Sequence, residues 1–62
     1  MRTKAYLLSW EDTNCLMAVR KIEMAIPCFI VILNKDEDWF EVTITCREED
    51  IAYVERELAP YV

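Results

Sequence analysis

The sequence contains no glycine and no histidine. Without histidine, the chain lacks the commonest general base and the commonest metal ligand of proteins. Phosphate-binding loops and dinucleotide-binding motifs need backbone conformations that only glycine supplies, so the missing glycine excludes both. A cysteine nucleophile would also lack the histidine that usually activates it. We therefore expect a protein that is not an enzyme and that needs no cofactor.

The chain also lacks a disulfide framework and long apolar runs. Its three cysteines, Cys15, Cys28 and Cys46, are an odd number without a Cys-x-x-Cys pair, which fits neither a disulfide framework nor a zinc site. The longest apolar run, Ile26 to Leu33, is far shorter than the roughly 18 residues of a membrane span. The N-terminus does not resemble a signal peptide. These features favour a cytoplasmic protein without a membrane segment.

The length of 62 residues predicts a single domain, residues 1–62. A chain this short buries only about 60% of the surface that its unfolded form exposes, so it is marginally stable alone. Small folds without disulfides or metals often gain stability by oligomerisation. We therefore expect a homodimer or a bound partner protein.

The N-terminal half predicts a strand followed by a helix. Lys4 to Leu8 has the composition of a strand, and Ser9 to Asp12 resembles a capping box, with Thr13 as a competing cap. Pro27 should end the helix, because it disfavours helical geometry at the preceding residue. The apolar positions of this helix recur every three or four residues: Leu16, Val19, Ile22 and Ile26.

Two strands and a turn follow. Cys28 to Leu33 is continuously apolar, which predicts a strand covered on both faces, or on one face and by a partner. In the polar turn 34–38, Asn34 or an aspartate should take any left-handed position, since no glycine is available. Trp39 to Cys46 alternates, which predicts one wet face. The residues expected to point inward are Phe40, Val42, Ile44 and Cys46.

A last helix is expected after a second capping box at Thr45 to Glu48, with Pro60 at its end. Its inner face would carry Ile51, Val54 and Leu58. The order strand-helix-strand-strand-helix predicts an α+β fold (βαββα), a three-stranded sheet with two helices on one face. A truncated ferredoxin-like sheet would place the third strand at its centre, whereas a simple 1-2-3 order would place the second strand there.

Charge is distributed unevenly along the chain. Residues 1–35 carry a net charge of +2, and residues 36–62 carry −7. This asymmetry predicts an acidic face that docks on a basic partner protein and does not itself bind nucleic acid. The alternative is that acids simply favour helix N-termini, turns and solubility. The predicted partner-binding residues are Asp36, Glu37, Asp38, Trp39, Glu41, Glu48, Glu49, Asp50 and Glu55.

Within this set, Trp39 should point outward with Glu41, as an aromatic anchor for a partner or as a cap on the sheet edge. The run Asp36 to Asp38 lacks the spacing and the glycine of a calcium loop, so a solvated turn is expected and no metal site. Cys28 and Cys46 should lie near each other, as a redox pair or as two small buried thiols.

The pattern resembles small signal-transducing modules of strand-helix-strand-strand-helix build, related to PII-like and ferredoxin-like domains. The matching segments are residues 23–33 (EMAIPCFIVIL) and residues 40–59 (FEVTITCREEDIAYVERELA). These families carry a glycine before the Ile-Pro step where this chain has Ala25, and no functional residue is carried over. In size and charge alone, the chain is also similar to virus-encoded inhibitors such as anti-CRISPR proteins.

Three hypotheses follow from the sequence. The first is an interaction protein whose acidic face docks on a basic partner, as an inhibitor that competes with nucleic acid. The second, implied by the resemblance, is a regulatory module that senses a small ligand as a dimer. The third is a structural subunit of a larger complex, which would leave an apolar interface when isolated.

Overall fold

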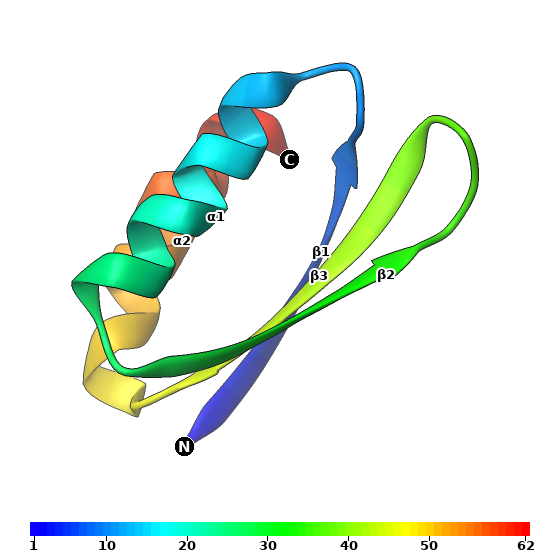
Figure 1. Ribbon diagram of the computed structural model, residues 1–62. Coiled ribbons are helices and arrows are strands. Elements are labelled where there is room, and N and C mark those ends of the chain that lie inside the picture. The colour runs from blue at the N-terminus through cyan, green and yellow to red at the C-terminus, as the bar shows by residue number, and fades with distance from the viewer.

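The computed structural model describes residues 1–62 and confirms the predicted α+β fold. Two helices cover one face of a three-stranded sheet (Figure 1). The Cα positions span 33 × 17 × 17 Å, so the molecule is elongated along its strands. In chain order, the elements are β1 (Arg2–Ser9), α1 (Thr13–Ala25), β2 (Cys28–Asn34), β3 (Trp39–Cys46), the 3₁₀ turn η1 (Glu48–Asp50), α2 (Ile51–Leu58) and the 3₁₀ turn η2 (Ala59–Tyr61).

The sheet has the order β1-β3-β2, and both neighbouring pairs are antiparallel. This is the truncated ferredoxin-like arrangement, and the alternative 1-2-3 order is excluded. The short turn after β2 brings β3 back beside it, while α1 carries the chain across the sheet between β1 and β2. Placing β3 in the middle gives two antiparallel ladders, which pair slightly better per residue than parallel ones. As a result, β1 and β2 are the two edge strands.

The core lies between the sheet and the helices. The four inward residues predicted for β3 are all fully buried, and the three predicted for α2 are buried too. In α1 the prediction is only partly correct, because Leu16 and Ile26 are half-buried at the margin of the core. Cys15 and Ala18 take the inner positions beside Val19 and Ile22. The helix is therefore turned slightly from the orientation that its largest apolar residues predict.

Both predicted capping boxes are wrong. Asp12 is the N-cap of α1, and its side chain accepts a hydrogen bond from the backbone N–H of Asn14 at 3.0 Å. Ser9 cannot cap the helix because it still pairs with Trp39 in the sheet. Thr45 lies within β3, where its hydroxyl is 2.9 Å from that of Thr3 on β1. The η1 turn starts without any side-chain cap.

The turn between β2 and β3 forms without a left-handed residue, so the position expected for Asn34 or an aspartate does not arise. No residue of the chain has a positive φ angle. Instead, Asp36 Oδ1 accepts hydrogen bonds from the N–H groups of Asp38 and Trp39, at 2.8 and 3.0 Å. The N–H groups of Lys35 and Asp36 both donate to the carbonyl of Trp39. An aspartate side chain thus replaces the backbone geometry that glycine would otherwise provide.

Candidate functional site

The nine predicted partner-binding residues do not form one surface. The segment Asp36–Trp39 lies at the tip of the β2–β3 hairpin, whereas Glu48–Asp50 follows the opposite end of β3 (Figure 1). Eight residues of extended strand separate the two groups, which is about 26 Å at the usual rise of β-structure. Glu55 lies on α2, and Glu41 lies within β3 near the hairpin. The structure therefore divides the predicted site into two parts.

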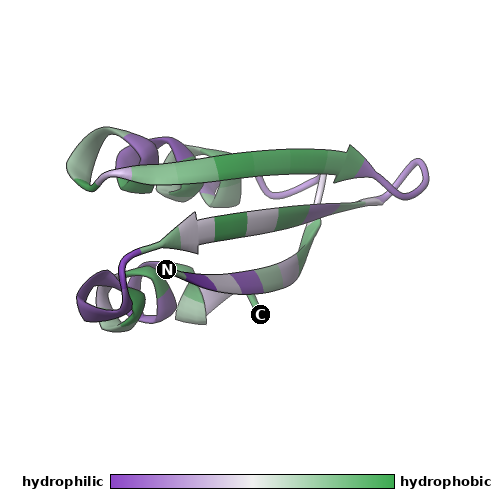
Figure 2. Ribbon diagram, turned by 90° about the horizontal axis from the view of Figure 1, so that it is seen from below, coloured by the Kyte–Doolittle hydropathy of each residue, from purple (hydrophilic) through white to green (hydrophobic).

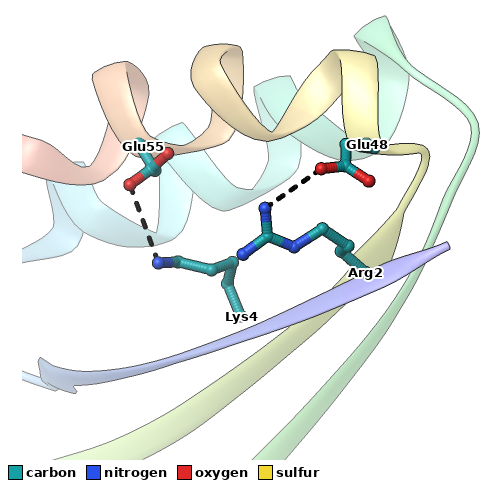
Figure 3. Close-up of polar contacts among 4 residues, drawn as sticks. All are labelled: Arg2, Lys4, Glu48 and Glu55. Atoms are coloured by element: carbon teal, nitrogen blue, oxygen red, sulfur yellow. Dashed lines mark hydrogen bonds and ion pairs between the residues drawn. The ribbon is translucent and has the colours of Figure 1, made fainter.

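The acids beyond β3 are paired with basic residues of the same chain. Arg2 lies 3.4 Å from Glu48 and Lys4 lies 3.6 Å from Glu55. Each pair joins β1 to the helical layer (Figure 3). Exposed pairs of this kind contribute roughly 0.2–1 kcal/mol each to stability, because water screens them. The remaining pairs are Arg47 with Glu49 and with Asp50, both at 3.2 Å, and Lys21 with Glu57 at 3.1 Å.

The hairpin tip is joined to the loop between β1 and α1. The backbone N–H of Trp10 donates to the carbonyl of Asp38 at 2.8 Å, and Trp10 Nε1 donates to Asn34 Oδ1 at 2.9 Å. The Trp10 ring also packs on the buried Phe40, with ring centroids 4.3 Å apart. These contacts place Glu11, which follows Trp10, beside the acidic hairpin.

Five carboxylates therefore gather at this end of the molecule, and none has an ion-pair partner in the chain. Lys35 is the one basic residue among them. Sequence reasoning missed two of the five, since the N-terminal half has a net positive charge. In the ferredoxin-like topology the β1–α1 loop and the β2–β3 hairpin lie at the same end of the sheet. The predicted topology could therefore have placed Glu11 and Asp12 beside the hairpin. The term acidic end is used below for these five residues: Glu11, Asp12, Asp36, Glu37 and Asp38.

The sheet face opposite the helices, here called the open face, carries exposed apolar side chains next to the acidic end. Trp39 points outward as predicted and is 43% exposed. Glu41 lies between Leu7 and Leu33 in the register of the three strands, and both leucines are exposed. Phe29 and Val31 continue the apolar surface along β2, where they are 70% and 54% exposed. A partly exposed aromatic side chain thus borders the unpaired carboxylates.

Cys15 and Cys46 are buried, and Cys28 is half-buried on the edge strand β2. Cys28 and Cys46 are direct cross-strand partners, both as free thiols. Burial raises the pKa of each thiol above its ordinary value. Cys46 raises the pKa of Cys28 further, and Asp50 raises that of Cys46. Burial likewise raises the pKa of Cys15, whose Sγ donates to the carbonyl of Asp12 at 2.9 Å. Since the thiolate is the reactive form, these are poor nucleophiles.

The other chemical features of the fold are few. No group of three or more Cys, Asp or Glu side chains is arranged so that it could hold a metal ion. None of the helices combines the length and the apolar character that crossing a membrane requires. No family model, no curated protein and no solved structure matches this chain. Function is therefore inferred from the residues and their geometry.

Proposed function

We propose that this chain is a non-catalytic protein-binding module that docks on a basic partner through its acidic end and Trp39. The observation that carries the proposal is the contrast between the two ends of the molecule. Carboxylates beyond β3 have basic partners within the chain, whereas the five of the acidic end have none. Unpaired charge of one sign attracts a surface of the opposite sign and speeds encounter with it.

Trp39 supplies the contact that charge alone does not provide. Charged groups at the rim of an interface contribute mainly to association rate and specificity. Tryptophan is among the residues that contribute most of the binding energy at interfaces. Trp39 is partly exposed and lies at the start of β3, directly after Asp38. A basic partner that also offers an apolar pocket would engage both, and a protein surface that normally holds nucleic acid has such a charge.

A charge-reversal experiment tests the acidic end without disturbing the fold. Glu11, Glu37 and Asp38 suit this purpose because their side chains make no hydrogen bond or ion pair within the chain, whereas Asp36 supports the hairpin turn. A partner captured from native lysate by the wild-type chain, after nuclease treatment, should lose at least about 10-fold in affinity for the E11K/E37K/D38K variant. The loss should shrink at high salt, where screening is stronger.

The matched control reverses three charges at the other end, in the variant E48K/E49K/E55K. The net change in charge is the same, so a response to total charge would affect both variants equally. Binding that survives the control but not the acidic-end variant supports the proposal. Equal loss in both variants, or no loss in either, would show that the acidic end is not the docking surface.

A further inference from the structure

The strand β2 forms an edge of the sheet that is unusually apolar and unprotected. Figure 2 shows β2 hydrophobic along almost its whole length, whereas the central strand β3 alternates. Between Cys28 and Asn34 there is no charged residue and no proline. Natural edge strands usually carry such residues, because a free row of N–H and C=O groups otherwise pairs with another chain. We propose that β2 pairs antiparallel with β2 of a second copy of this chain, which joins two sheets into one of six strands.

The sequence of β2 is self-complementary under a two-fold rotation. When the axis passes through Val31, the middle residue of the strand, Val31 meets its own copy and Phe29 meets Leu33 on the open face. Ile30 then meets Ile32 on the face toward the helices. Every cross-strand pair near the centre is apolar, and pairs between β-branched or aromatic residues stabilise antiparallel sheets. A two-fold interface needs just this kind of match of a surface with itself.

Charge also favours a second copy at this place. Two chains of net charge −5 repel each other, so close approach is easiest where charge is absent. Antiparallel pairing about Val31 puts the two Asn34 residues about 20 Å apart along the strands, with the two acidic ends beyond them. That separation exceeds the Debye length of about 8 Å at physiological ionic strength, so their repulsion is largely screened.

A groove beside β2 would be closed by the same pairing. It has a volume of about 230 Å³ and lies between α1 and the free edge of the sheet. Ile32, at 45% exposure, forms part of its apolar wall. Arg20 and Glu23 also line it, and neither has an ion-pair partner within the chain. The two-fold rotation sets the α1 helices of the two copies antiparallel, so Arg20 and Glu23 of one copy run in the opposite order to those of the other.

The first test is the mass of the wild-type chain in solution. Sedimentation equilibrium and light scattering should show a dimer that dissociates on dilution. In the dimer, amides of β2 should become protected from hydrogen exchange as concentration rises, while those of β1 should not. A wild-type chain that is monomeric up to high micromolar concentration would overturn the proposal, independently of any variant.

The second test uses a matched pair of substitutions. Val31→Lys places two ammonium groups opposite each other on the two-fold axis and should weaken the dimer by about 100-fold or more. Ala5→Lys is the control, because Ala5 is exposed in the same row of the open face, on the opposite edge strand. Circular dichroism establishes that both variants are folded. If A5K dissociates the dimer as strongly as V31K, the copies stack through their open faces and edge pairing is wrong.

Discussion

At the scale of single residues, the core is almost free of unsatisfied polar groups. Twelve residues are buried, all of them apolar or cysteine. The exception is the hydroxyl of Tyr6, which is buried and has no hydrogen-bond partner. Burial raises the pKa of this hydroxyl above its ordinary value, with Glu55 as a further cause. An unsatisfied buried hydroxyl costs stability, because it has given up its hydrogen bonds to water.

We therefore predict that Tyr6→Phe stabilises the fold by about 1 kcal/mol, since it removes the hydroxyl and keeps the ring. Urea unfolding followed by tryptophan fluorescence measures the change. Tyr53→Phe is the control, because the hydroxyl of that half-buried tyrosine is not buried, and its removal should change stability little. A loss of stability in Tyr6→Phe would mean that the hydroxyl has a partner after all.

At the scale of elements, aspartate side chains stabilise the start of a helix and a tight turn in a chain that has no glycine. Asp12 caps α1, and Asp36 closes the β2–β3 turn with two hydrogen bonds to backbone N–H groups. Both residues belong to the acidic end, so this end contains structural carboxylates as well as free ones. Substitutions there must therefore distinguish between carboxylates that hold a turn and those that face only water.

The helix cap gives a direct prediction. Asp12→Ala should destabilise the fold by about 1 kcal/mol, the usual cost of losing an N-cap side chain. Chemical denaturation of the variant measures this loss. Glu11→Ala removes the same charge from the neighbouring residue, whose side chain makes no bond within the chain, and it should leave stability within about 0.5 kcal/mol of wild type. Equal effects in the two variants would indicate that charge, and not capping, is responsible.

At the scale of the whole molecule, burial favours the protonated, uncharged form of one tyrosine and the three cysteines. Burial is the largest cause that raises the pKa above its ordinary value in four side chains: Tyr6, Cys15, Cys28 and Cys46. In the unfolded chain these groups lose their protons near their ordinary pKa values of 9.0 and 10.0. In the folded chain they do so only at higher pH. Between these limits the unfolded state binds fewer protons, so the stability of the fold decreases as pH rises.

The free energy of unfolding should therefore be nearly constant around neutral pH and should fall steadily above about pH 9. Urea titrations at a series of pH values, with a reducing agent present, check this. Cys46→Ala should be less stable at every pH but should lose less stability on going to high pH, because one of the four groups is gone. Constant stability into the strongly alkaline range would contradict the raised pKa values.

The sequence predicted the architecture well because its strongest signals are periodic. Alternation from Phe40 to Cys46 determined both the strand and its buried face, and the spacing of Val54 and Leu58 did the same for α2. Caps failed because they depend on where a strand ends, which pairing between β1 and β3 decides. The grouping of Glu11 with the hairpin depends on hydrogen bonds made by Trp10 to residues far along the chain. No local pattern contains that information.

The two edges of the sheet differ in a way that limits assembly. On β1, Arg2 and Lys4 reach across to carboxylates of the helical layer, so that edge carries fixed charges (Figure 3). A sheet with two adhesive edges could add chains without limit and grow into a fibre. In the proposed dimer, β2 of each chain would pair with β2 of the other, and the β1 edges left outside would carry Arg2 and Lys4, which disfavour pairing with a third chain. Association of this kind would stop at two chains, so this glycine-free chain of 62 residues would form a dimer and not a fibre.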